Sequence, residues 1–243
     1  MKKIYFCASL ALAALFLFFL AKRLARGYFW DSPLTRISTV LADVQGDDEP
    51  ELVAISRTLG LTPYGFHGKS LLVLEDESSW GFHRIISEFD IEEAKPLKVM
   101  AGDVNRDGSN EVSVMVYKTA EFHPVFALRP FFFNVSRGKL EAVWLGSRLS
   151  QPFVEYFLLD VNGDGFEEIV ALEETRESYL IASYSWESFG FVCDARSEEL
   201  SLKSIAPILS EDGFGRILAD LGTEGTQEFF LDHDKIIPVP GNQ

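Results

Sequence analysis

Cysteine, histidine and positive charge are scarce in this sequence of 243 residues. The two cysteines, Cys7 and Cys193, are too few for a disulfide-rich scaffold or for a zinc site built mainly from thiolates. Lysine and arginine number 22 against 37 acidic residues, which gives a formal net charge of −15. Because binding of phosphate groups needs clustered basic side chains, this balance argues against nucleic acid as a partner.

The short motifs of several enzyme classes are also absent. The four histidines form neither a His-x-His nor a His-Glu-x-x-His spacing. The sequence has no Gly-x-Ser-x-Gly elbow and no Gly-x-x-x-x-Gly-Lys phosphate loop. We therefore predict no catalytic residue and no organic cofactor, and we expect that the protein is not an enzyme.

One long hydrophobic run is present near the N-terminus. Ile4 to Ala21 is apolar apart from Ser9. A helix that crosses a bilayer needs about 20 such residues, so this run is just long enough. A cleaved secretory signal is the alternative, but the basic residues that follow the run fit a cleavage site poorly. Residues 1–26 are thus expected to be a membrane anchor or an uncleaved signal, and residues 27–243 a separate domain.

A repeated pattern occurs four times in that domain. Each copy is an apolar stretch, an aspartate, a polar loop, a glutamate and a second apolar stretch. The first aspartates lie at spacings of 60, 57 and 60 residues, and they are Asp43, Asp103, Asp160 and Asp220. Short strand patterns lie between the loops, at Lys69–Leu74, Phe82–Ile86, Val125–Asn134, Leu140–Leu145, Tyr179–Trp186 and Phe191–Cys193. Evenly spaced short strands at this period are typical of propeller blades.

The four loops resemble the calcium-binding loops of FG-GAP and VCBS repeats, as in the integrin α-chain propeller. The resemblance covers about residues 35–232; it is close in loops two and three and looser in loops one and four. It implies side-chain oxygen ligands at positions 1, 3, 5 and 9, a backbone carbonyl at position 7 and glycine at position 6. The implied Ca²⁺ ligands are Asp160, Asn162, Asp164, the Phe166 carbonyl and Glu168 in loop three, Asp103, Asn105, Asp107, the Ser109 carbonyl and Glu111 in loop two, and Asp43, Gln45, Asp47 and Glu51 in loop one.

Two of the loops depart from the pattern. In loop one Asp48 replaces the glycine, although aspartate tolerates a positive φ better than most residues do. In loop four Gly222 supplies no side-chain ligand, so we expect this loop to bind calcium weakly or not at all. An EF-hand is excluded because position 12 of loops two and three is Val114 and Ala171 instead of the required glutamate.

The predicted fold is therefore all-β: a small propeller of about four FG-GAP-like blades behind an N-terminal transmembrane helix. Residues 35–43 should open the first blade. The last blade ends with Ile236–Pro240 and lacks an outer strand, so Gly27–Trp30 is expected to pair there and close the ring. A shortened propeller that is completed by another chain is the alternative.

The predicted function is a membrane-anchored, calcium-stabilised module that binds a protein or a glycan without catalysis. Loops of this kind suit millimolar external calcium, so the protein should be single-pass with its C-terminal domain outside the cytoplasm. The alternatives are an accessory or structural subunit of a membrane complex and a propeller-based enzyme domain. The connections that carry Tyr64, Phe66 and Phe122 should lie on the face opposite the loops; a partner site there competes with ordinary surface turns.

Overall fold

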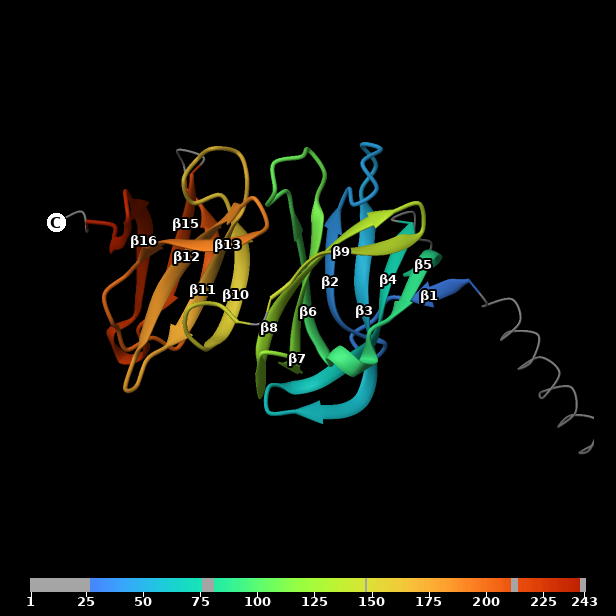
Figure 1. Ribbon diagram of the computed structural model, residues 1–243, viewed down its shortest axis with the longest axis horizontal. Coiled ribbons are helices and arrows are strands. Elements are labelled where there is room, and N and C mark those ends of the chain that lie inside the picture. The colour runs from blue at the N-terminus through green and yellow to red at the C-terminus, as the bar shows by residue number, and fades with distance from the viewer. Residues whose placement is uncertain (1–26, 76–80, 147, 211–213, 241–243) are drawn as a thin grey trace, which may run out of the picture.

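The computed structural model describes residues 27–75, 81–146, 148–210 and 214–240, and their regular structure is almost entirely β (Figure 1). The exceptions are two single-turn 3-10 helices, η1 (Glu92–Ala94) and η2 (Gly222–Glu224). The all-β prediction is confirmed. The expected anchor, residues 1–26, lies outside the described residues. Within the described ranges, no helix has the length and apolar character needed to span a membrane.

The strands form three antiparallel sheets, apart from one parallel bridge. The first sheet has the order β1-β5-β4-β3-β2, with β1 (Tyr28–Trp30), β2 (Arg36–Ala42), β3 (Glu51–Thr62), β4 (Gly65–Glu75) and β5 (Phe82–Asp90). The second sheet has the order β6-β7-β8-β9, with β6 (Pro96–Gly102), β7 (Glu111–Ala120), β8 (His123–Ser136) and β9 (Lys139–Leu145).

Strands β2 to β5 of the first sheet form one antiparallel meander, and the second sheet forms another. The third sheet is eight-stranded and consists of two further meanders, the third and the fourth. The third meander is β10 (Phe153–Leu159), β11 (Glu168–Glu174), β12 (Tyr179–Glu187) and β13 (Gly190–Arg196). The fourth meander is β14 (Ser204–Leu209), β15 (Gly215–Asp220), β16 (Thr226–Asp232) and β17 (Lys235–Pro238). A single parallel bridge between Arg196 and Lys235 joins them. The sheet curls until its two edge strands, β10 and β14, are in contact.

The first half of β7, the second strand of the second sheet, is buried on both faces. Val112 and Val114 pack into the hydrophobic cluster shared with the first sheet. Met115, on the other face, packs into the cluster shared with the third and fourth meanders, and Ser113 bonds the Tyr156 hydroxyl of β10 there at 2.8 Å. Because side chains alternate along a strand, this continuous apolar run indicates a sheet packed between two others. The fold is propeller-like in this sense: each meander packs face to face on the next.

The meanders form an open row rather than a closed ring. Contacts between neighbours run from β2 to β6, from β6 to β10 and from β10 to β14. The first sheet and the fourth meander lie at opposite ends of the long axis (Figure 1). The prediction that Gly27–Trp30 pairs with the last meander is therefore wrong. Instead β1 pairs with β5, where Phe29 lies opposite His83, because that free edge is within reach of the short connection to β2.

The last meander also differs from its prediction. Its chain does end at β17, close to the expected Ile236–Pro240. Its first strand, however, is β14, which precedes β15 and pairs with it along its whole length. The strand was missed because its six-residue segment is short and contains Pro207, which weakens the local strand signal.

Candidate metal centre

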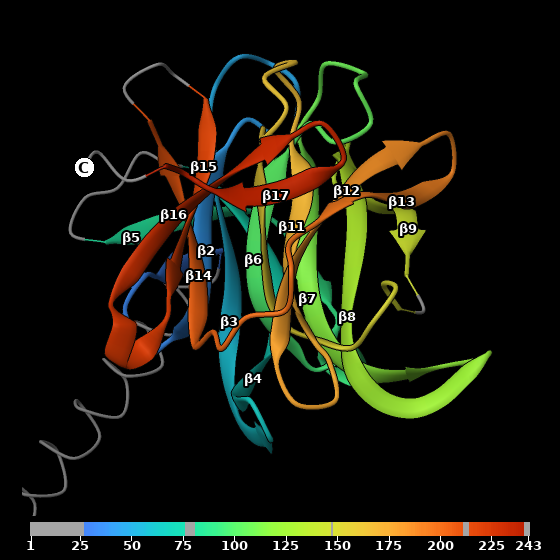
Figure 2. The ribbon, with the colours of Figure 1, turned by 90° about the vertical axis from the view of Figure 1, so that its left-hand side faces the viewer.

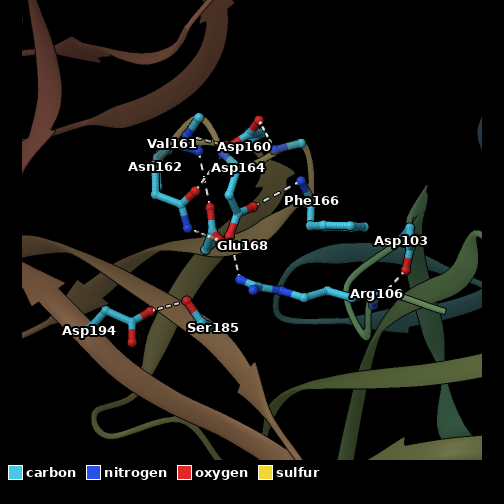
Figure 3. A network of polar contacts seen from close by, with 12 residues as sticks. Asp103, Arg106, Asp160, Val161, Asn162, Asp164, Phe166, Glu168, Ser185 and Asp194 are labelled. Carbon is cyan, nitrogen blue, oxygen red and sulfur yellow. Dashed lines mark hydrogen bonds and ion pairs between the residues drawn. The ribbon is translucent and has the colours of Figure 1, made fainter. Parts of the chain in front are cut away.

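Loops one, two and three connect the first two strands of the first three meanders and share one conformation. In loop three, Asp160 Oδ1 accepts hydrogen bonds from the backbone N–H of Gly163 at 2.6 Å and of Asp164 at 3.2 Å, and Oδ2 accepts one from Gly165 at 2.8 Å (Figure 3). Asp103 and Asp43 hold loops two and one in the same way. The first aspartate therefore organises each loop.

Position 6 of each loop has a positive φ. Gly108 and Gly165 have φ angles of 87° and 90°, as the pattern predicts. Asp48, which replaces glycine in loop one, has a φ of 66°. The expectation that aspartate can take this conformation is confirmed, because loop one closes with the same hydrogen bonds as its neighbours.

The glutamate at position 9 is buried in all three loops. Glu51, Glu111 and Glu168 are 4%, 0% and 2% exposed. Glu168 Oε2 accepts the Val161 N–H at 3.1 Å, and Oε1 accepts the Asn162 side-chain amide at 2.7 Å (Figure 3). The same two bonds recur in loops two and one. The structure thus brings the predicted ligands at positions 3 and 9 into direct contact.

The buried carboxylates of loops two and three are electrostatically unfavourable as anions. Burial, together with the nearby Asp107 and Asp103, raises the pKa of Glu111 to about 7 against the hydrogen bond from Val104. Burial likewise raises the pKa of Glu168 to about 8, with Asp164 and Asp160 acting in the same direction. Both loops therefore concentrate negative charge that a bound cation would offset.

The donor set of these loops fits a hard cation, although the donors do not converge. Carboxylate, amide and carbonyl oxygens are the ligands that calcium prefers. Across the described ranges, however, no three or more Asp, Glu, His or Cys side chains are gathered closely enough to hold a metal ion. The hydrogen bonds within each loop explain this, because they direct the carboxylates of Asp160 and Glu168 to backbone N–H groups.

The three loops are tied to one another at one end of the sheets. The Asn110 side-chain amide donates to the Asp43 carbonyl at 2.9 Å, which links loop two to loop one. The Glu167 N–H donates to the Asp103 carbonyl at 3.4 Å, which links loop three to loop two. The candidate sites therefore lie side by side, so that a change in one loop bears directly on the next.

Arg106 is a residue at these loops whose contacts the sequence pattern did not predict. Its guanidinium bonds Asp164 Oδ2 of loop three and lies 5.2 Å from the centre of the Phe166 ring (Figure 3). Its φ is 68°, whereas loops one and three have glycine at the same position, Gly46 and Gly163. An arginine in place of glycine at this position was the one feature of the sequence that could have singled out Arg106. Arg106 places a tethered positive charge on a predicted calcium ligand.

Loop four has a different structure. Among the described residues, the Asp220 side chain accepts one hydrogen bond, from the Gly222 N–H at 2.7 Å, and the loop continues as η2. Glu228, the counterpart of Glu168, has a side chain that is 44% exposed and pairs with Arg216 at 3.5 Å. Loop four therefore lacks the buried glutamate that the other three loops share.

Comparisons with known proteins show the fold and no family. The chain matches no family model and no curated protein. A Bacteroides uniformis protein described as a 6-phosphogluconolactonase matches with a TM-score of 0.51 and 11% identity over 84% of this chain and 53% of that one. The exotype rhamnogalacturonan lyase YesX matches with a TM-score of 0.48 and 12% identity over 81% of this chain and 45% of the lyase. The chain thus spans about half the length of these solved structures.

These comparisons contradict the prediction that the protein is not an enzyme. The Bacteroides uniformis structure that shares its architecture is described as a 6-phosphogluconolactonase, which is an enzyme. The prediction rested on the absence of short catalytic motifs, and that absence does not exclude catalytic groups contributed by separate parts of the chain. At 11% identity the likeness establishes the fold alone, so it assigns no reaction to this chain.

Proposed function

We propose that the protein is a calcium-stabilised module that is anchored in a membrane by residues 1–26 and binds a protein or glycan outside the cytoplasm. The observation that carries this proposal is the shared geometry of loops one to three, each with a buried glutamate beside the side chain at position 3. The resemblance of these loops to FG-GAP and VCBS repeats supports it. Each meander then corresponds to one blade, four in all, in a propeller that the chain leaves open.

Loop three is the most complete of the proposed sites. Calcium supplies positive charge there and ties together the ends of β10 and β11. The chain's own part is to hold the loop closed through Asp160 and to keep Glu168 buried beneath it. The residues that would hold the ion are Asp160, Asn162, Asp164, the Phe166 carbonyl and Glu168, with the corresponding sets in loops two and one.

Calorimetric titration of the full chain in detergent tests the metal assignment. We expect calcium to bind at millimolar concentration or below and to raise the Tm. A ligand that binds only the folded state adds about 2.7 kcal/mol per site at a hundredfold excess over Kd. Magnesium should substitute poorly, because it prefers a tighter octahedron with retained waters. Absence of calcium binding at millimolar concentration would show that the loops are only acidic turns.

A reporter fusion tests the membrane orientation separately. A reporter that is active only in the cytoplasm, fused after Gln243, should give little activity if the domain lies outside. A matched fusion to residues 27–243 alone, which lacks the predicted anchor, should give strong activity. Strong activity from the full-length fusion would contradict the proposed location.

The open row of sheets favours a second role, as a subunit of a membrane complex. The first sheet and the fourth meander lie at opposite ends of the molecule, so another chain could continue the row at either end (Figure 1). The mass of the detergent-solubilised protein distinguishes the two roles. A stable assembly with a second chain supports the subunit role, and a monomer supports an independent module.

A further inference from the structure

A cavity of about 480 Å³ lies among the first three meanders, at the end opposite loops one to three. Its walls come from the beginnings of β2, β6 and β10 and from the long β3–β4 hairpin. Figure 2 shows this hairpin extending beyond the sheets at the end away from the loops. The side chains that matter here are Arg57, Lys98, Tyr64, Phe66, Ser38 and Glu155. The volume is within the range of small-ligand sites, about 300–1,000 Å³.

The hydrogen bonds of the two basic side chains in this cavity go to backbone carbonyls. Lys98 Nζ donates to the Tyr156 carbonyl at 3.2 Å, and Arg57 Nε donates to the Arg36 carbonyl at 3.3 Å. Within the part of the chain that the structure describes, neither forms an ion pair. In this chain of net charge −15, by contrast, Arg36, Arg84 and Arg106 each pair with a carboxylate. Unpaired cations in a cavity therefore indicate an anionic ligand.

The charge balance of the cavity supports the same conclusion. Glu155 is the one acidic residue in its lining, and its Oε1 accepts the Ile205 N–H of β14 at 2.8 Å. Burial lowers the pKa of Lys98, while the nearby Glu155 acts to raise it. An anion bound beside Lys98 would offset the cost of burying its charge.

Aromatic rings in fixed orientations form the rim of the cavity. Tyr64 meets Tyr117 edge to face, with ring centres 5.6 Å apart, and Tyr117 lies 5.4 Å from Phe126 of the neighbouring hairpin. Phe66 has the Arg57 guanidinium 5.6 Å from its ring centre. Tyr64 and Phe66 both remain about half exposed. Exposed flat rings beside polar groups suit the apolar C–H faces of a sugar ring, which stack on them.

We propose that this cavity binds a carboxylated saccharide, with its carboxylate at Lys98 and Arg57 and a sugar ring on Tyr64 or Phe66. This deepens the proposed function by naming the ligand class and its site. A cavity of this volume between the ends of β2, β6 and β10 suits one or a few rings, whereas an extended acidic peptide needs a groove or a free strand edge. The site lies at the opposite end of the strands from the calcium loops, so the two can be tested apart.

Titration of the full chain with trigalacturonate tests the proposal. We expect saturable binding, with little binding of the neutral galactose trimer or of inorganic phosphate. Arg57→Gln and Lys98→Gln should each weaken the affinity at least tenfold, and Tyr64→Ala should weaken it severalfold. Lys69→Gln is the matched control, because Lys69 is an exposed lysine that faces Asp90 on the first sheet. It should leave the affinity unchanged.

Three outcomes would overturn the proposal: no binding of trigalacturonate, equal binding of the neutral trimer, or equal binding of a glutamate tripeptide. Arg57 is exposed, so Arg57→Gln should fold even if the change at Lys98 does not. Unchanged trigalacturonate affinity in folded Arg57→Gln would also overturn it. Calcium titration of the same variants keeps the two ideas separate. Calcium binding without trigalacturonate binding refutes the cavity assignment alone, and the reverse result refutes the calcium assignment alone.

Discussion

Loops three and four begin with the same sequence pattern and have different structures. Both follow an apolar strand with an aspartate and end with a glutamate at position 9. Glu168 is buried beneath loop three, whereas Glu228 is only partly buried and pairs with Arg216. The side chain at position 3 accounts for the difference, because Asn162 donates to Glu168 and Gly222 has no side chain with which to donate. An Asp and a Glu at the right spacing are therefore not sufficient to form a loop with a buried glutamate.

The strands that follow these loops differ as well. In the third meander, β11 ends with a second buried acid, Glu173, whose Oε1 accepts hydrogen bonds from the Tyr184 hydroxyl and, at 3.2 Å, from the Gln151 N–H. In the fourth meander, the acid near the end of β16 is Asp232, which is exposed. The third meander thus buries acids at both ends of its central strand, and the fourth buries neither.

The largest expected difference follows from replacing the first aspartate. Asp160→Ala removes the acceptor of three backbone N–H groups and a proposed calcium ligand. We expect it to destabilise the apo protein by about 2 kcal/mol and to remove the share of the calcium response that loop three provides. Asp220→Ala removes one such bond and should cost less than about 1 kcal/mol. Thermal unfolding with calcium and with chelator measures both. An equal loss of calcium response in the two variants would contradict the comparison.

The next largest effect concerns the buried acid of β11. Burial raises the pKa of Glu173 despite the hydrogen bond from Tyr184. Because folding raises the pKa of Glu173, protonated Glu173 stabilises the fold fully at pH values below its pKa in the unfolded chain. This stabilisation is lost as the pH rises through the pKa of Glu173 in the folded protein. Glu173→Gln cannot ionise, so its Tm relative to wild type should increase as the pH rises above about 4.5.

Glu228→Gln is the matched control for this pH series. It removes only an exposed ion pair with Arg216, which is worth about 0–1 kcal/mol. Parallel Tm profiles for wild type and Glu173→Gln between pH 4 and pH 8 would show that burial of Glu173 carries no ionisation cost.

Much of the fold could be predicted from the sequence, because the strands and loops have strong local signals. The short strand pattern Tyr179–Trp186 predicted most of β12, and the apolar run Val125–Asn134 predicted most of β8. The partner of Gly27–Trp30 could not be predicted, since which free edge a short strand reaches depends on how the sheets are arranged. The closed ring was wrong for the same reason, because local patterns do not determine the angle between successive sheets.

The ligand sets of the candidate site could also be read from the sequence, but their arrangement could not. The pattern assigned Asn162 and Glu168 to one loop, and the structure brings them into contact. It did not reveal that Arg106 bonds Asp164, because that contact joins residues 58 positions apart. The cavity at the other end was missed for the same reason. Its walls come from three meanders, and no single segment carries its signal.

A smaller effect should separate backbone strain from metal binding. Gly165 and Gly225 occupy position 6 of loops three and four with φ angles of 90° and 91°, and an added Cβ would meet open space in both. Gly165→Ala and Gly225→Ala should each cost about 1 kcal/mol of stability through strain alone. Calcium affinity should fall only in Gly165→Ala. Thermal unfolding and calorimetry measure the two quantities, and an equal fall in affinity would place a working site in loop four.

The smallest expected effect concerns the arginines that pair with an acidic residue of loop three or loop four, Arg106 and Arg216. Arg106 places its charge on Asp164, so calcium must compete with a tethered cation for that carboxylate. Both side chains are partly exposed, and an exposed ion pair is worth about 0.2–1 kcal/mol. Arg106→Gln should therefore raise the calcium affinity of loop three by up to about fivefold. Arg216→Gln, which frees Glu228 in loop four, should leave calcium binding unchanged. Calorimetry of both variants in one buffer decides the point, and a lower affinity in Arg106→Gln would show that the arginine supports the site instead of competing for it.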